Sequence, residues 1–570
     1  MMYYISSHIR LRQRNMLVSM WITVFCSFSW IQPAVSQVAN IQDPGLLRAV
    51  REALGQSGGT IITVEDLESL VELNASHRGI ESIDGLEDAV NLQTLNLSNN
   101  QLKSLSLPNS FARLSQLNLG GNQLTHLIIP EALGNLQRLY LHDNQLTGLT
   151  FPVELRLLRD LNLGGNQLTH LELPEAVSNL KRLYLHDNQL ISLTFPEEFH
   201  FLKELHLPRN RLASLDFLIG LNSLQVLDLG DNQLTSLTLP GELLSRMRKL
   251  DLSDNQLVSL TFPDEFSPME FLLLGGNQLT RLVVPQGLAR LEWLFLNDNL
   301  LTSLTLPHEM ARLEWLILSN NQLTSLTLPD GLARLQRLIL NDNQLTSLTL
   351  PDELNLLRKL YLRNNQFTHL TLPDGLVNLR MLYLDGNQLT NLILSDGLYR
   401  LQSLWLSDNH LTSLTLPDGL GNLESLFLDN NQLTNLRLPN GLNRLEVLRL
   451  WGNQLLAKLY VPAGTSLPGS IVGDSPLDIT GIEATFYTNL RGFTRNDEGD
   501  VQFTLYASAG DFLVQRSFEL QGEWSGGRMI RISENEPAEY DLTHTGAVEF
   551  RDQQPHDSQA SFYRILKVEP

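Results

Sequence analysis

The stretch "NQLTSLTLP" occurs three times without a change, beginning at Asn232, Asn321 and Asn343. Close variants surround these copies, among them "NLLTSLTLP" from Asn299 and "NHLTSLTLP" from Asn409. Aligning them gives a unit of 22 residues, L-x-x-L-x-L-x-x-N-Q-L-T-S-L-T-L-P-D-G-L-x-x. A coil this short cannot bury its own leucines, so it is stable only when it is stacked between copies of itself. The repeat therefore predicts a solenoid.

The unit recurs in seventeen copies, with one extra residue after the seventh copy, and each copy has an asparagine at the same position. An amide at that turn can bond the open backbone groups of neighbouring coils, because buried backbone groups need partners. We therefore predict a structural role for these asparagines. They are Asn100, Asn122, Asn144, Asn166, Asn188, Asn210, Asn232, Asn255, Asn277, Asn299, Asn321, Asn343, Asn365, Asn387, Asn409, Asn431 and Asn453.

The stretch L-x-x-L-x-L-x-x-N-x-L resembles the leucine-rich repeat, and the resemblance covers about residues 70–462. It implies one short parallel strand for each L-x-L, on a concave face, with the leucines pointing inward. The alternating leucines of "LTSLTLP" suit a second extended segment on the convex side, with the threonines outward. The expected fold is an α/β-type solenoid, mostly β and loop, with a helical N-terminal cap and a small C-terminal all-β sandwich.

The segment "DPGLLRAVREALG" from Asp43 has helical apolar spacing and ends on Gly55, which predicts a helix that caps the first coil. Together with "IESIDGLEDAVNLQTLNLSNNQL" from Ile80, it resembles the cap and first coils of the internalins, which are secreted bacterial surface proteins. Internalins bind host receptors through the concave face. Because the concave residues are not a shared motif, the resemblance names no ligand for this chain.

The sequence predicts four regions. Residues 1–36 read as a secretory signal, because Arg10, Arg12 and Arg14 precede an apolar stretch that ends in the small residues "AVS"; an uncleaved anchor is the alternative. Residues 37–91 hold the cap and a degenerate first repeat, and 92–465 hold the seventeen repeats. In 466–570, segments such as "VQFTLYA" alternate with period two, which predicts a β-sandwich-like domain. This last region resembles a β module that ends many secreted bacterial repeat proteins.

The charge and the cysteine content of the chain limit which partners and which chemistry we expect. The chain has 62 acidic and 41 basic residues and a net charge of −21, which argues against nucleic acid and anionic membrane surfaces as partners. Its one cysteine, Cys26, lies inside the predicted signal, so the mature chain would have no disulfide. We expect a secreted protein, either extracellular, on the cell surface or periplasmic. We also expect no membrane span after signal cleavage, no cofactor, and a monomer or weak dimer.

Three patterns suggest chemistry, and we interpret none of them as a catalytic or metal site. "GQSGG" matches the G-x-S-x-G of serine hydrolases, but a helix precedes Ser57 and an extended segment follows, the reverse of what that motif needs. "LHDN" places His142 and His186 two coils apart, roughly 10 Å, which is too far for one ion. Aspartates before the repeat asparagine lack the spacing of a calcium loop: Asp143, Asp187, Asp231, Asp254, Asp298, Asp342 and Asp408. We therefore do not expect an enzyme.

Residues that flank an inward leucine must point to the concave face, because side chains alternate along a strand. Between the two strand leucines, the first eight coils carry Asn96, Asn118, Tyr140, Asn162, Tyr184, His206, Asp228 and Asp251. In the next eight coils these positions become apolar or aromatic, and neighbouring positions add to the change. The predicted binding residues are Phe271, Leu273, Trp293, Phe295, Trp315, Ile317, Arg337, Ile339, Lys359, Tyr361, Tyr383, Trp405 and Phe427.

The favoured hypothesis is a binding module that holds a protein, peptide or glycan on this face. Trp293 and Trp315 would be its energetic centre, with Arg337 and Lys359 as polar guides. Two other uses of the same residues stay open: a stacked ladder that stiffens the sheet, or a surface covered by the C-terminal domain or by a second copy. The alternative for the whole protein is a structural or envelope spacer without a specific ligand.

Overall fold

The computed structural model describes residues 37–197, 199–239, 241–263, 267–456 and 458–461, and the backbone of the strands between 471 and 568. The predicted signal, 1–36, lies outside these residues. The chain divides into two compact units, Met1–Leu180 and Lys181–Pro570, which are described separately.

Unit 1 begins with two short helices, α2 (Pro44–Ala53) and α3 (Val64–Glu68). Asp43 caps α2 by accepting the N–H groups of Gly45 and Leu46, and α3 begins with a capping box in which Thr63 and Asp66 bond each other's backbone. Helix α2 buries Leu46, Ala49 and Val50, the apolar face that its spacing predicts.

Five parallel strands follow in unit 1 and pair in chain order. They are β1 (Glu72–Asn74), β2 (Thr94–Asn96), β3 (Gln116–Asn118), β4 (Arg138–Tyr140) and β5 (Asp160–Asn162). The unit also contains β6 (His170–Glu172) and two 3-10 turns, η1 (Glu131–Leu133) and η2 (Glu175–Val177). Each paired strand places its leucine opposite the leucine of the next coil.

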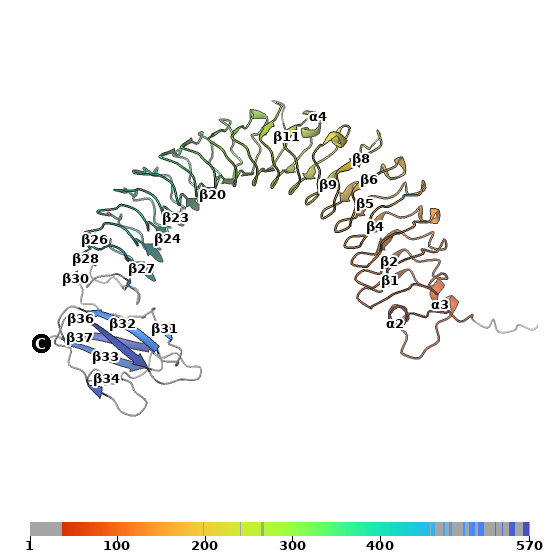
Figure 1. Ribbon diagram of the computed structural model, residues 1–570, viewed down its shortest axis with the longest axis horizontal. Coiled ribbons are helices and arrows are strands. Elements are labelled where there is room, and N and C mark those ends of the chain that lie inside the picture. The colour runs from red at the N-terminus through yellow and green to blue at the C-terminus, as the bar shows by residue number, and fades with distance from the viewer. Residues whose placement is uncertain are drawn as a thin grey trace, which may run out of the picture. The chain divides into compact units, whose positions relative to one another are not determined.

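Unit 2 contains a longer series of parallel strands of the same kind, which Figure 1 shows along the inner side of its coils. We call this series the inner sheet. Its strands are β7 (Arg182–Tyr184), β9 (Glu204–His206), β10 (Val226–Asp228), β12 (Lys249–Asp251), β14 (Phe271–Leu273), β16 (Trp293–Phe295), β18 (Trp315–Ile317), β20 (Arg337–Ile339), β22 (Lys359–Tyr361), β23 (Met381–Tyr383), β24 (Ser403–Trp405), β25 (Ser425–Phe427), β27 (Val447–Arg449) and β29 (Ile471–Val472).

A second set of short strands lies on the far side of each coil, and here they are called the outer strands. In most of them the central leucine is buried and the residues on both sides are exposed, whereas the central leucines of β17 and β21 are half-buried. In unit 2 they are β8 (Ser192–Thr194), β11 (Ser236–Thr238), β13 (Ser259–Thr261), β15 (Arg281–Val283), β17 (Ser303–Thr305), β19 (Ser325–Thr327), β21 (Ser347–Thr349), β26 (Asn435–Arg437), β28 (Lys458–Tyr460) and β30 (Asp478–Thr480). Short 3-10 turns η3 (Asp216–Leu218) and η4 (Gln286–Leu288) connect some coils.

The last strands of the chain pair in antiparallel fashion. Their pairings are β31–β32–β36, β33–β37 and β34–β35. Their bounds are β31 (Thr494–Arg495), β32 (Val501–Ala507), β33 (Asp511–Ser517), β34 (Ile530–Arg531), β35 (Ala538–Glu539), β36 (Gly546–Asp552) and β37 (Phe562–Val568). The period-two segments of the sequence thus contain strands, whereas their assembly into a sandwich stays a prediction.

The extra residue after the seventh copy is absorbed within one coil. That coil contains a short α-helix, α4 (Gly241–Leu244), between β10 and β12. The register of the inner sheet is kept across it, since Leu227 still pairs with Leu250. The irregularity is therefore confined to the loop side of the coil.

The repeat asparagines are buried and bond the backbone of two coils at once. Asn321 is 7% exposed. Its Nδ2 donates to the carbonyl oxygens of Leu318, 3.1 Å away in the same coil, and of Leu296, 2.9 Å away in the preceding coil. Its Oδ1 accepts the N–H of Leu301 at 2.9 Å. The same bonds recur along both units, for example at Asn122 and Asn409.

We expect Asn321→Ala to lower the free energy of unfolding by about 1–3 kcal/mol, because it leaves the buried N–H of Leu301 without its partner and removes one of the two asparagine amides that bond each of the Leu296 and Leu318 carbonyl oxygens. Equilibrium unfolding in urea, followed by circular dichroism, measures the change. Asn435→Ala is the matched control, since Asn435 is exposed on β26 and its side-chain amide bonds, among the described residues, just the neighbouring Thr434 hydroxyl. Equal stability of the two variants would contradict a structural role for Asn321.

Candidate binding surface

The predicted binding residues lie in two adjacent columns of the inner sheet. In each strand from β14 to β25 the central leucine is buried, and the residues on both sides of it are half-buried. One column pairs Phe271 with Trp293 and Trp293 with Trp315. The other runs without a break from Leu273 to Phe427. We call the predicted binding residues of β14 to β25 the strip.

Two groups of rings occupy the strip. In the first, the Trp293 and Trp315 ring centroids are 4.7 Å apart with an angle of 12° between the planes, and Phe271 meets Trp293 edge-on at 4.9 Å. In the second, Tyr361 and Tyr383 stack at 4.4 Å and 3°. Trp405 follows Tyr383 at 5.0 Å, and Phe427 follows Trp405 at 4.2 Å. Each inner ring thus turns its faces toward its neighbours along the column.

Arg337 lies next to Trp315, at the end of the first group of rings. Its guanidinium carbon lies 3.9 Å from the centroid of the Trp315 ring, in the geometry of a cation–π contact. Lys359 is the register partner of Arg337 on the next strand and is half-buried. The Tyr361 hydroxyl donates to Sδ of Met381 at 3.3 Å. Burial raises the pKa of Tyr361, and the nearby Tyr383 acts in the same direction.

Two arginines, Arg363 after β22 and Arg449 at the end of β27, also contact the strip, and the sequence analysis missed them. Arg363 lies 5.2 Å from the Trp405 ring centroid and pairs with Asp385, and Arg449 lies 5.7 Å from the Phe427 centroid and pairs with Asp429 at 2.9 Å. Burial raises the pKa of Asp385 and of Asp429, although the arginines oppose the shift. The sequence signal for Arg363, Asp385 and Asp429 was a charged residue two positions before the repeat asparagine. For Arg449 it was a position in the same column as Phe427.

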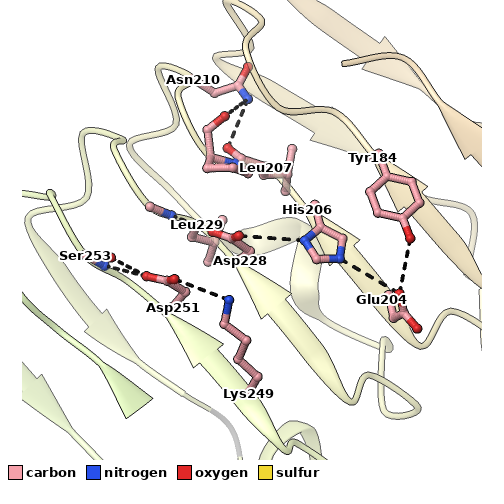
Figure 2. Close-up of polar contacts among 12 residues, drawn as sticks. Tyr184, Glu204, His206, Leu207, Asn210, Asp228, Leu229, Lys249, Asp251 and Ser253 are labelled. Atoms are coloured by element: carbon pink, nitrogen blue, oxygen red, sulfur yellow. Dashed lines mark hydrogen bonds and ion pairs between the residues drawn. The ribbon is translucent and has the colours of Figure 1, made fainter. Parts of the chain in front are cut away.

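A polar cluster lies on the same sheet, on strands β7 to β12 (Figure 2). The Tyr184 and His206 rings stack at 4.8 Å and 9°. His206 lies between two carboxylates, with Nδ1 3.7 Å from Asp228 and Nε2 4.0 Å from Glu204. Lys249 follows two strands further, 3.5 Å from Asp251. Burial opposes the ionisation of Asp228, but bonds from His206 and from the Gly230 N–H, with the charge of Lys249, lower its pKa overall.

The residue before each repeat asparagine has a left-handed backbone. All seventeen copies have a positive φ there, between 51° at Asn364 and 73° at Gly452. Glycine, asparagine and aspartate tolerate this conformation best. The aspartates weighed as calcium ligands occupy these positions, so backbone geometry accounts for them. Where a coil has Asn320, its amide donates to Asp298 of the preceding coil at 2.6 Å.

Arg209 is the exception in this row, because arginine is not favoured at a φ of 56°. Its guanidinium pairs with Asp187, which occupies the same place in the preceding coil. The hydrogen bond from Arg209 is the main cause of the lowered pKa of Asp187.

The other patterns of the sequence contribute no residue to the strip. Ser57 is exposed in the turn after α2, so a helix precedes it as expected. His142 and His186 lie in different units. Within the described ranges, no three His, Cys, Asp or Glu side chains are grouped so that they could hold a metal ion. No helix of the same residues is both long and apolar enough to cross a membrane.

Profiles of three leucine-rich repeat families match the chain. The "BspA type Leucine rich repeat region (6 copies)" matches residues 229–344 and 339–455, "Leucine Rich repeats (2 copies)" matches 90–128, and "Leucine Rich Repeat" matches 179–202. The chain is a leucine-rich repeat protein. Leucine-rich repeat proteins commonly serve as protein-binding scaffolds with extended binding surfaces. No curated protein matches the sequence.

Solved structures with this fold include bacterial proteins. The functional domain of InlJ from Listeria monocytogenes is 20% identical, with a TM-score of 0.53, over 83% of this chain and 96% of that one. YopM from Yersinia enterocolitica is 25% identical, also with a TM-score of 0.53, over 81% and 99%. A leucine-rich repeat protein of Leptospira interrogans is 30% identical over 65% and 92%, with a TM-score of 0.49.

Asp254 is one of the residues with positive φ that precede the repeat asparagines, and its ionisation should make the stability of the protein depend on pH. Burial raises the pKa of Asp254 above its ordinary 3.8, and the negative charges of Asp231, Asp251 and Asp298 add to the shift. The folded state therefore binds this proton more tightly than the unfolded chain does, so the contribution of Asp254 to stability falls as pH rises through the raised pKa. Asp254→Asn, which tolerates the same φ, should raise the unfolding temperature at pH 7.

Below the unfolded pKa of 3.8 Asp254 is protonated in both states, so the gain from Asp254→Asn should fade there. Thermal melts at pH 7 and at about pH 3 measure the two values. A gain of the same size at both pH values would show that charge is not its cause.

Proposed function

We propose that this protein is a binding module that holds a segment of another protein, or a peptide, on the strip. The observation that carries the proposal is a continuous series of half-exposed apolar and aromatic side chains on eight successive strands, β14 to β25. The strands before β14 carry polar residues at the same positions, among them His206, Asp228 and Asp251. A change of character within otherwise uniform repeats is what a local binding surface would require.

Two physical arguments support this use of the strip. Contiguous apolar surface is costly to leave in water, and large patches of it on soluble proteins commonly mark interaction sites. In addition, ring–ring and ring–arginine contacts restrict the side chains before any partner arrives, so binding loses less conformational entropy. Trp293 and Trp315 combine large area with fixed position, and we propose them as the energetic centre.

Further parts of the proposal concern the rest of the chain. We propose a secreted, cell-surface or periplasmic location, which rests on the predicted signal in residues 1–36, and a monomer or weak dimer without enzymatic activity. In the same way α2 is proposed as the cap of the first coil, and residues 466–570 as a sandwich-like domain. The proposed domain boundaries stay those of the sequence analysis.

The ring stacking also favours the alternative function, a spacer stiffened by an aromatic ladder. Aromatic pairs add about 0.5–1.5 kcal/mol beyond their buried area. A spacer would lose rigidity when the rings are removed, but it would lose no ligand. The two functions therefore differ in which measurement responds to the same substitution.

The test is the double variant Trp293→Ser/Trp315→Ser in the mature chain. Peptides selected from a random display library on the wild-type protein serve as probes, and fluorescence anisotropy gives their Kd. We expect affinity to fall by at least about ten-fold, because each central aromatic anchor contributes about 2 kcal/mol or more. Circular dichroism checks the fold.

The matched control is Val283→Ser/Ile393→Ser, which removes two exposed apolar side chains on the outer side of the coils. The control should keep the wild-type affinity. If the tryptophan variant binds the selected peptides as tightly as the wild type does, and only its melting temperature falls, the spacer is the better account.

A further inference from the structure

Basic side chains lie in and beside the strip, between its two groups of rings. Arg337 on β20 and Lys359 on β22 stand in the column that begins with Phe271, Trp293 and Trp315. Arg358 and Arg380, the residues just before β22 and β23, lie beside them, and the Arg380 N–H donates to the Arg358 carbonyl oxygen at 2.9 Å. We call these four residues the cationic group. They come from three consecutive coils of a chain whose net charge is −21.

Among the residues that the structure describes, the cationic group has no carboxylate partners of the kind that other basic residues of this sheet have. Arg248 pairs with Glu270 at 2.9 Å, Lys249 with Asp251 at 3.5 Å and Arg449 with Asp429 at 2.9 Å. Within the described residues, no carboxylate oxygen lies within 4 Å of a side-chain nitrogen of the cationic group. Arg358 and Arg380 are exposed, and Arg337 and Lys359 are half-buried.

The arrangement also places like charges side by side. Arg337 and Lys359 are register partners, and Arg358 and Arg380 follow one another in adjacent coils. Like charges directly opposite each other on neighbouring strands destabilise a sheet. Among the described residues the contact of Arg337 with the Trp315 ring offsets part of this cost. A local cost that the chain offsets only in part is typical of a functional site, where the remaining compensation comes from a ligand. Here the missing partner is an anion.

The stacked rings restrict what kind of anionic ligand fits. A sugar ring would need an open aromatic face, but Trp315 lies between Trp293 and Arg337, and Tyr383 lies between Tyr361 and Trp405. The ring edges and the aliphatic side chains of Ile317 and Ile339 remain toward the open side. Such a surface suits the apolar side chains of a peptide better than the face of a sugar.

We propose that the strip binds an extended peptide segment with acidic side chains at its centre and apolar side chains at both ends. This inference rests on the proposed function and adds the partner's chemistry. Its acidic side chains pair with Arg337, Arg358, Lys359 and Arg380, and its two apolar ends contact the ring groups around Trp293 and Trp405. From β16 to β24 there are five strand spacings, about 24 Å, which an extended peptide spans with about seven residues.

The experiment uses three fluorescent peptides about nine residues long, enough to span this distance. All have the same apolar ends, and the centre consists of aspartates, asparagines or lysines. Anisotropy titrations with the mature wild-type chain give the Kd of each. We expect the aspartate peptide to bind at least about ten-fold more tightly than the asparagine peptide, because charge-assisted bonds are stronger than neutral ones. The lysine peptide should bind most weakly.

The key variant is Arg358→Gln/Arg380→Gln, which leaves the ring contacts untouched. It should weaken the aspartate peptide by about ten-fold and leave the asparagine peptide unchanged. Arg281→Gln/Arg437→Gln is the matched control, because it removes the same charge from exposed positions of β15 and β26 on the outer strands. The control should keep the wild-type Kd, and about 1 M salt should remove the preference for aspartate, since it shortens the screening length to about 3 Å.

Four outcomes would overturn the inference. Equal affinity for the aspartate and asparagine peptides would leave an apolar binding surface, and thus the proposed function, but no acidic partner. If the control variant lost as much affinity for the aspartate peptide as the key variant, the net charge of the protein would explain the effect. If none of the three peptides bound, the proposal of an acidic peptide partner would be wrong. It would also be wrong if polygalacturonate bound in their place and this binding depended on Arg358. The proposed function itself is tested separately, by the binding of the selected peptides to the Trp293→Ser/Trp315→Ser variant.

Discussion

The asparagine amide is the interaction on which the stack of coils depends. A coil of 22 residues turns sharply after its strand, and the turn leaves backbone carbonyl and N–H groups in a region lined with leucine. Each repeat asparagine bonds these groups in its own coil and in the preceding one. One side chain thus satisfies the turn and fixes the distance to the neighbouring coil. The leucines can then fill the interior without burying unpaired polar groups.

The same turn explains a second pattern, which the sequence alone led us to weigh as chemistry. The residue before the asparagine must adopt a positive φ, and the chain uses aspartate, asparagine or glycine there in every copy except the one with Arg209. A row of carboxylates follows as a by-product of this backbone requirement. Asn320, Asn364 and Asn430 separate some of these carboxylates and bond the aspartate of the preceding coil. Residues that share this backbone geometry thus space the carboxylates apart and give them hydrogen-bond donors.

Much of the architecture could be predicted because the repeat fixes it. The spacing of leucine and asparagine indicates the period, the parallel register and which side chains share a column, since side chains alternate along a strand. Contacts made by long side chains could not be predicted in this way. The position of Arg337 over Trp315, and the pairing of Arg363 with Asp385, depend on side-chain rotamers and on residues beyond the strand. The sequence likewise contains no sign of how the rings tilt against one another.

The coil that contains α4 shows how this solenoid can change in length. Its additional residue is taken up on the loop side, while the leucine register and the bond from Leu234 to the next asparagine, Asn255, are preserved. Because adjacent coils meet through the same contacts, insertion or loss of a whole repeat would leave every other junction as it was. Such a change between Trp315 and Tyr361 would move the two ring groups apart or together by one strand spacing. Evolution could therefore adjust the surface to longer or shorter partners in discrete steps, without redesigning the interior.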